Sequence, residues 1–165
     1  GLGQFGIQFL KLMTPARIVV VDTSEDKRRA ALDLGADAVV DGAAPDAVEQ
    51  VRAIAGGGAG AVLDFVGADA TLALGLAVLD QRGLMVMVGL AGGSVPVGFF
   101  RLPQEAHIVS SAWGTMSDLR EVVALAREGK IDCRIQRFGL DEINEAYEAL
   151  ARGEIEGRAV IHPQR

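Results

Sequence analysis

The chain opens with GLGQFGIQFLKLM over residues 1–13, and the run RIVVVD follows over residues 17–22. Gly1, Gly3 and Gly6 have the G-x-G-x-x-G spacing, and apolar residues at helical intervals follow them. In such a loop the first glycine permits a tight turn, the second admits a pyrophosphate to the backbone, and the third allows close helix packing. The RIVVVD run is β-branched throughout, which is typical of a strand covered on both faces. Together the two stretches predict a loop, a helix and a strand of a parallel α/β sheet.

Strand-like and helix-like patterns alternate along the rest of the chain. The predicted strands span residues 17–22, 38–40, 61–66, 84–88, 107–112 and 158–162. The helices predicted after the first one span residues 25–34, 45–55, 69–79, 117–128 and 141–151. Strand–helix–strand units at this spacing predict right-handed crossovers in a parallel sheet. The predicted fold class is therefore α/β, with a Rossmann-type, doubly wound parallel sheet.

A strand normally precedes a G-x-G-x-x-G loop, and this sequence begins at Gly1. That strand normally lies at the centre of the sheet, between the strands predicted at residues 17–22 and 61–66. Without it, two strands keep unpaired edges, which disfavours a stable fold. We therefore expect a sheet that lacks its first strand, in a chain that is a fragment of a longer polypeptide.

The amino-acid composition excludes several classes of protein. The 165 residues suit about one domain, and the 50% hydrophobic content excludes intrinsic disorder. The net charge of -6 argues against a nucleic-acid partner, and no apolar run is long enough to span a membrane. Cys133 is the single cysteine, which excludes an internal disulfide and a cysteine-cluster zinc site. A cytoplasmic location is expected on this basis.

Asp22 ends the strand that follows the glycine loop. An acidic side chain there accepts hydrogen bonds from the adenosine ribose hydroxyls and repels a 2′-phosphate, which favours NAD over NADP. The simpler alternative is a generic α/β turn with a solvated aspartate at the strand end. A methyltransferase also uses an acid at this point, but its loop usually lacks the third-glycine spacing.

Seven short motifs extend this pattern to the rest of the chain. They are DTSEDK at 22–27, LGAD at 34–37, DFVGA at 64–68, VGL at 88–90, VGFF at 97–100, WGT at 113–115 and GEIEGR at 153–158. In this order they resemble the medium-chain dehydrogenase/reductase superfamily, and in particular zinc-dependent alcohol dehydrogenases of the bacterial secondary-alcohol type. The resemblance covers essentially the whole chain.

The resemblance implies the cofactor-binding part of a two-domain enzyme that transfers hydride between an alcohol and NAD. In that family a GroES-like domain upstream carries the zinc, which polarises the substrate oxygen. Residues 1–115 would form the NAD-binding domain, and residues 116–165 would return to the catalytic domain. The substrate would be a small alcohol or ketone, and the protein a homo-oligomer, either dimer or tetramer. No catalytic or metal-ligating residue is expected in this chain, so we expect it to be inactive alone.

The resemblance also implies residues that bind the adenosine side of the cofactor. The glycine loop would hold the pyrophosphate, with backbone amides near Gln4 and Phe5 as donors. Asp22 would bind the ribose, with Lys27 beside it, and Arg158 would reach the pyrophosphate. The simpler interpretation of Lys27 is a solvated helix face, and Arg158 rests on the resemblance alone.

On the nicotinamide side, the implied contacts follow three strands. They are Val66 and Gly67, then Val88, Gly89 and Leu90, then Ser111 and Trp113. The last two would hold the carboxamide through main-chain groups, although Ser111 departs from the more usual glycine-containing version. By itself Trp113 would more often be a core residue. Two alternatives remain open for the whole chain: a non-catalytic NAD(H)-binding module, and a zinc-free NAD(P)H reductase of the same superfamily.

Overall fold

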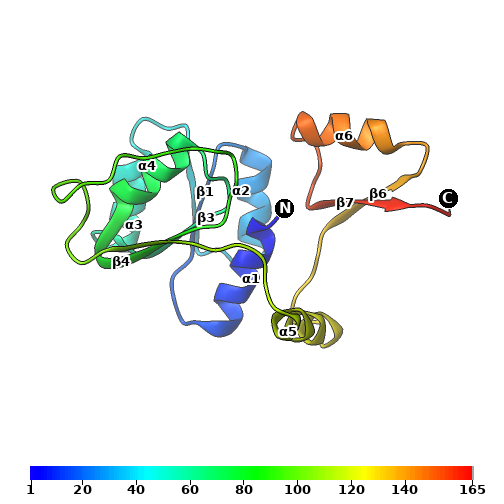
Figure 1. Cartoon of the computed structure of the whole chain (residues 1–165), viewed down its shortest axis with the longest axis horizontal. Helices are drawn as coiled ribbons and strands as arrows, with labels where there is room; N and C mark the ends of the chain where they lie inside the picture. The colour runs from blue at the N-terminus through cyan, green and yellow to red at the C-terminus, as the bar shows by residue number, and fades with distance from the viewer. Residues whose placement is uncertain (165) are drawn as a thin grey trace.

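A computed structural model describes residues 1–164, and all of its paired strands run parallel (Figure 1). The helices are α1 (Gly3–Met13), α2 (Glu25–Asp33), α3 (Ala47–Ala55), α4 (Asp69–Val78), α5 (Met116–Arg127) and α6 (Ile143–Ala151). The strands are β1 (Val19–Asp22), β2 (Ala38–Asp41), β3 (Ala59–Asp64), β4 (Leu79–Met87), β5 (His107–Ser110), β6 (Ile135–Gly139) and β7 (Arg158–His162). The predicted α/β fold class is confirmed.

The strands pair in three ladders, β1–β2, β3–β4–β5 and β6–β7. Among the described residues, no ladder joins β1 to β3. The β1–β2 and β3–β4–β5 ladders therefore end on either side of the place where the sequence predicts the missing strand. Each of β1 and β3 keeps one edge without a strand partner.

Side chains alternate between the two faces of the first ladder. Val20 packs with α1 and α2 around Ile7 and Ala31, whereas Val19 and Val21 pack with α3 and α4. Successive strand residues point to opposite faces, so both faces of β1 are buried under helices. This two-sided packing confirms the doubly wound arrangement.

The carboxyl-terminal part of the chain has a core of its own. Phe138, Ala146, Ala149 and Ile155 form a buried cluster between α6 and the β6–β7 ladder. Figure 1 shows this unit to one side of the larger α/β body, with α5 projecting below both. Within the described chain, α5 contributes no buried residue.

Two differences from the predicted elements have clear causes. The strand predicted at residues 84–88 begins earlier, at Leu79, because β3 pairs with both parts across a register shift. The strand β6 was not predicted, because IQRFG is a short and largely polar run whose only partner is the distant β7. No helix among the described residues is long and apolar enough to cross a membrane.

Candidate cofactor-binding site

The candidate site lies at the carboxyl ends of the parallel strands. Within the described residues β1 and β3 head two separate ladders, so the strand order reverses between them. In open α/β sheets, ligands bind outside the carboxyl ends of the strands at such a reversal. The start of α1 reaches this edge, since a Cβ atom at Gly6 would touch the ring of Phe65, the residue that follows β3.

The glycine loop leads directly into α1. The N–H groups of Phe5 and Gly6 donate to the Leu2 carbonyl oxygen at 3.0 and 3.1 Å. Within residues 1–164, the N–H groups of Gly3 and Gln4 have no acceptor. Of the two amides expected as donors, that of Gln4 is thus free and that of Phe5 is engaged. Free amides at the positive end of a helix dipole suit an anion.

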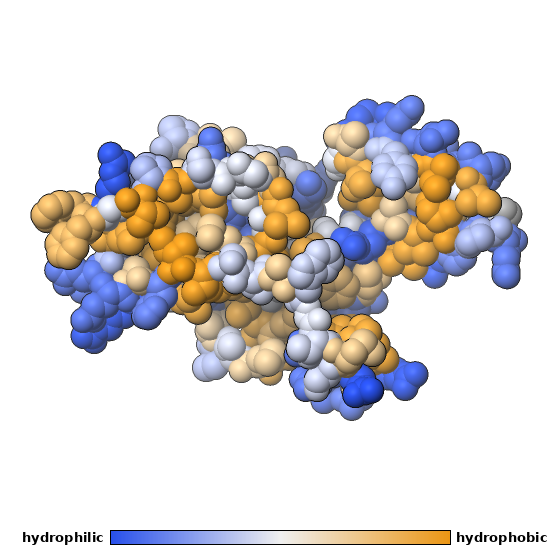
Figure 2. Space-filling view, viewed as in Figure 1, coloured by the Kyte–Doolittle hydropathy of each residue, from blue (hydrophilic) through white to orange (hydrophobic). Residues whose placement is uncertain are grey.

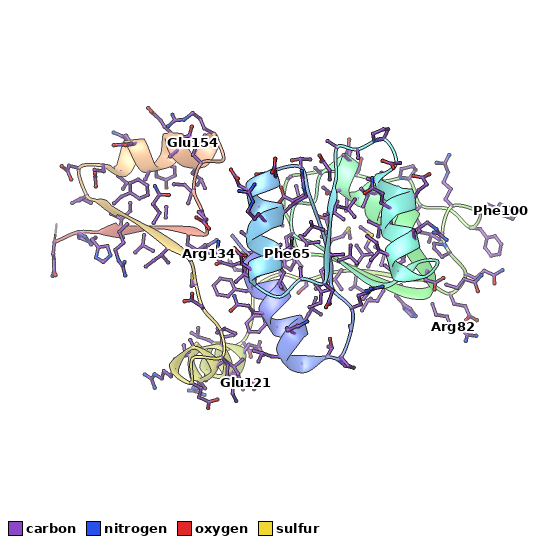
Figure 3. The ribbon with its side chains drawn as sticks, turned by 180° about the vertical axis from the view of Figure 1, so that it is seen from behind. Phe65, Arg82, Phe100, Glu121, Arg134 and Glu154 are labelled. Atoms are coloured by element: carbon purple, nitrogen blue, oxygen red, sulfur yellow. The ribbon has the colours of Figure 1, made fainter. Side chains whose placement is uncertain are left out.

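The second and third glycines differ in their surroundings. A Cβ atom at Gly3 would meet nothing within 4 Å, so the loop surface is open there. A Cβ atom at Gly6 would lie 2.6 Å from Cζ of Phe65, whose ring lies beside α1 (Figure 3). Gly6 therefore lets the helix approach the end of β3, whereas Gly3 leaves room for a ligand.

The side chain of Arg158, the first residue of β7, reaches the glycine loop. Its Nη1 atom lies 3.5 Å from the position that a Cβ atom at Gly1 would take. The positive charge of Lys27 also acts at Gly1. Two cations thus act on the loop that carries the free amides, which favours a bound anion.

Asp22 is held at the end of β1 by a local turn. Its Oδ1 atom accepts a hydrogen bond from the Ser24 N–H at 2.9 Å. Arg28 donates from Nη1 to the Asp22 carbonyl oxygen at 2.7 Å and pairs with Asp41 at 3.3 Å. These contacts orient the Asp22 carboxylate, and within the described residues its Oδ2 atom has no donor. That oxygen can accept from a ribose hydroxyl.

The loop after β3 is organised by the buried carboxylate of Asp64. Its Oδ1 atom accepts from the N–H groups of Val66 and Gly67 at 2.8 and 2.9 Å. Its Oδ2 atom accepts from the Thr71 hydroxyl at 2.8 Å. The Asp64 side chain therefore shapes a loop in which two nicotinamide contacts are expected.

The loops after β3 and β4 touch each other through glycines. A Cβ atom at Gly67 would overlap the Gly89 carbonyl, and a Cβ atom at Gly89 would overlap the Val66 backbone. Val66 and Leu90 expose 52% and 86% of their surface beside this contact. The structure thus brings these predicted residues together and leaves their apolar side chains accessible to a flat ring.

The end of β5 adds the third strand of the nicotinamide side. The Ser111 N–H donates to the Met87 carbonyl oxygen at 2.9 Å, which places Ser111 next to the end of β4 near Val88. Trp113 has a positive φ of 64° and is 97% exposed. The interpretation of Trp113 as a core residue is therefore wrong.

Sequence reasoning missed two contributors to this edge. Arg28, which carries no predicted role, holds the ends of β1 and β2 together. Its position three residues before the buried Ala31 places both on one helix face, which is the signal that could have identified it. The second is Asp64, whose side chain binds the Thr71 hydroxyl as well as two backbone N–H groups.

Side chains that could bind a metal ion do not form a cluster in the described part of the chain. Among residues 1–164, no group of three or more His, Cys, Asp or Glu side chains is placed to hold an ion. The described residues therefore do not fit the zinc that the resemblance implies.

Known proteins share the sequence of this chain over most of its length. The profile of the zinc-binding dehydrogenase family matches residues 1–128. The chain belongs to this family. The curated relatives include the NAD-dependent alcohol dehydrogenase of Sulfurisphaera tokodaii, 34% identical over 99% of this chain and 48% of that protein. They also include the D-arabinose 1-dehydrogenase (NADP(+)) of Saccharolobus solfataricus, 36% identical over 99% of this chain and 47% of that protein.

Solved structures of the family have the same fold. The crystal structure of the alcohol dehydrogenase from Aeropyrum pernix matches with a TM-score of 0.93 and 39% identity, over 99% of this chain and 47% of that one. This match confirms the Rossmann-type fold. The chain spans about half the length of the curated relatives it matches.

Proposed function

We propose that this chain is the NAD-binding portion of a zinc- and NAD-dependent alcohol dehydrogenase. The observation that carries the proposal is the arrangement around the glycine loop. Arg158 reaches Gly1 of the loop whose Gly3 and Gln4 amides are free, and Asp22 ends the neighbouring strand with a free carboxylate oxygen. Free amides, a cation and a free carboxylate oxygen at a strand-order reversal support the proposal, because a dinucleotide requires anion donors and a ribose acceptor there.

The chain's own residues would bind and orient the cofactor. The glycine loop and Arg158 would hold the pyrophosphate, Asp22 the adenosine ribose, and Lys27 would add positive charge. The loops after β3, β4 and β5 would hold the nicotinamide ring, with Ser111 and Trp113 at its carboxamide. When bound, NAD supplies the hydride acceptor at that ring.

The name of the Sulfurisphaera relative supports hydride transfer between an alcohol and NAD as the activity of the whole protein. The substrate would be a small alcohol or ketone. Because residues 1–164 hold no zinc ligand set, the zinc would belong to an upstream domain. On this proposal residues 1–165 alone would not turn over alcohol. A cytoplasmic location, expected from the single cysteine, stays a prediction.

We propose two units within the chain, residues 1–115 for NAD binding and residues 116–165 for completing the catalytic domain. The exposed apolar side of α5 supports this division, since Met116, Leu119 and Val123 are 65%, 53% and 40% exposed. Figure 2 shows apolar side chains at the surface of this helix. The rest of the catalytic domain would cover them.

We further propose that the protein is a homo-oligomer, a dimer or a tetramer. Phe99 and Phe100 are 91% and 97% exposed at the end of a loop, and Figure 3 shows Phe100 pointing away from the molecule. Their rings stack edge to face at 5.1 Å. Exposed apolar side chains grouped in this way mark an interaction surface.

The preference for NAD over NADP needs a test, because relatives of this family use either cofactor by name. Replacing Asp22→Gly removes the charge that would repel a 2′-phosphate. We expect the ratio of the NADPH to the NADH dissociation constant to fall at least roughly tenfold, equivalent to about 1.4 kcal/mol.

The matched control for this test is Asp26→Ala, which removes the same charge from an exposed position four residues further along the chain. It should leave the ratio within about twofold. Unchanged discrimination in Asp22→Gly would show that this carboxylate does not meet the ribose.

A further inference from the structure

The side chain of Gln4 is buried although it lies in the glycine loop. Only 9% of Gln4 is exposed, and both ends of its amide face the segment before β6. Its Oε1 atom accepts from the Arg134 N–H at 3.0 Å, and its Nε2 atom lies 3.9 Å from Cys133 Sγ. A buried amide that binds a segment about 130 residues away fixes the position of that segment.

A second glutamine on α1 binds the same segment. Gln8 accepts from the Asp132 N–H at 2.7 Å and donates to the Asp132 carbonyl oxygen at 2.9 Å. Residues four apart on a helix share one face, so Gln4 and Gln8 hold successive parts of one connecting segment. Of these two glutamines, Gln4 bonds to Arg134 and Gln8, in the described structure, does not.

From Gln4 a short series of contacts leads back to the loop. The Arg158 N–H donates to the Arg134 carbonyl oxygen at 3.0 Å. The Arg158 guanidinium then lies beside Gly1, with Nη1 3.5 Å from a Cβ position there. The peptide unit of Arg134 thus lies between the Gln4 side chain and the backbone of Arg158.

We propose that Gln4 is a positioning residue, whose side chain fixes Arg158 over the pyrophosphate site through the Arg134 backbone. The inference rests on the proposed NAD site and adds the residue that holds its arginine in place. Arg158 is exposed at the start of a strand that shares no ladder with β1–β5. Its position at the loop therefore depends on contacts such as those of Gln4, which joins the two units of the chain.

The test compares Gln4→Met with Gln8→Met in the intact protein. Methionine has a similar length and helix propensity but cannot accept or donate these hydrogen bonds. Calorimetry would measure the dissociation constants of ADP-ribose, which contains the pyrophosphate, and of adenosine, which does not. We expect Gln4→Met to weaken ADP-ribose binding roughly fivefold, about 1 kcal/mol, with adenosine binding unchanged.

Gln8→Met is the control, because it removes three hydrogen bonds, two to Asp132 and one to the Gln4 carbonyl oxygen, without removing any bond to Arg134. It should leave ADP-ribose binding within about twofold, whatever its effect on unfolding. In an Arg158→Met background, Gln4→Met should add less than about twofold, since its effect acts through Arg158. If Gln4→Met does not fold, Gln4→Asn, which is one methylene shorter, replaces it in the same comparisons.

Three results would overturn the positioning role while the proposed function stands. These are equal losses in the Gln4 and Gln8 variants, independent effects of Gln4→Met and Arg158→Met, or an unchanged ADP-ribose constant in the Gln4 variant. Failure of the unsubstituted protein to bind either ADP-ribose or NADH would overturn both the positioning role and the proposed function.

Discussion

The larger α/β body and the carboxyl-terminal segment use their apolar residues in opposite ways. In the body, α4 buries Leu72 to 3% exposure between the sheet and its neighbours. In the segment, α5 has a comparable apolar side, yet Leu119 on it is 53% exposed. The difference indicates that the helices of the α/β body are covered on their apolar sides, whereas α5 presents a surface suited to further contacts.

The largest expected effect comes from truncating the same residue type in each region. Leu72→Ala should lower the free energy of unfolding by about 2–5 kcal/mol, because it leaves a cavity in a filled core. Leu119→Ala should change it by no more than about 0.5 kcal/mol while nothing covers α5. Urea unfolding of both variants measures the difference.

An equal loss of unfolding free energy in Leu72→Ala and Leu119→Ala would contradict the difference in burial between the two regions. A larger Leu119 cost in a longer polypeptide that contains an upstream domain would sharpen it, because that domain would then cover α5.

The difference between buried and exposed elements also explains which strands could be predicted from the sequence. The strands β1 and β3 were predicted because burial on both faces requires apolar runs, and the glycine spacing marked the start of α1. The strand β6 was missed because its first three residues, which include Gln136 and Arg137, are exposed, and burial is confined to Phe138 and Gly139 at its end, which is too short for an alternating pattern. Pairing with a distant strand, and not local preference, determines it.

Side-chain contacts between residues far apart in the sequence could not be predicted from it either. The positions of Asp22 and the glycines follow from local spacing, so they could be predicted. The contact between Gln4 and Arg134 joins residues about 130 positions apart and depends on the folded chain. The i, i+4 spacing of Gln4 and Gln8, which puts both side chains on one helix face, is the sequence signal that indicates a common binding partner.

A second prediction concerns the loop that carries Val66 and Gly67. Asp64→Ala leaves three donors without their acceptor, two backbone N–H groups and the Thr71 hydroxyl. We expect the free energy of unfolding to fall by about 3 kcal/mol, with weaker NADH binding as the loop relaxes. Denaturant unfolding and an NADH titration of this variant provide the measurement.

Asp69→Ala serves as the control for Asp64→Ala, because the exposed Asp69 accepts one hydrogen bond, from the Ser94 N–H at 2.6 Å. It should cost no more than about 1 kcal/mol. If both variants lost equal stability, the loop would not depend on the buried carboxylate.

The smallest expected effect is a pH dependence at the end of α1. The Ile18 N–H, and then Lys11, hold the pKa of the Asp37 carboxyl below its ordinary value. A lowered folded-state pKa gives stability that is present above the ordinary carboxyl pKa of about 3.9 and lost as the pH falls through the folded value. The stability difference between the unsubstituted protein and Asp37→Asn should therefore persist at pH 5 and shrink below about pH 4.

Unfolding at a series of pH values measures this difference, with Asp26→Asn, an exposed acid on α2, as the comparison. A difference that had already disappeared at pH 5, or that stayed constant down to pH 2, would show that these contacts do not act through the charge of Asp37.

The central claim is that the carboxyl edge of β1–β5, with the glycine loop and Arg158, is a dinucleotide site. Calorimetric titration of the purified protein with NADH tests it most directly, followed by the same titration in the presence of saturating ADP-ribose. The account predicts one saturable NADH site per chain, which ADP-ribose blocks. Absence of saturable binding, or NADH binding that ADP-ribose does not affect, would contradict it.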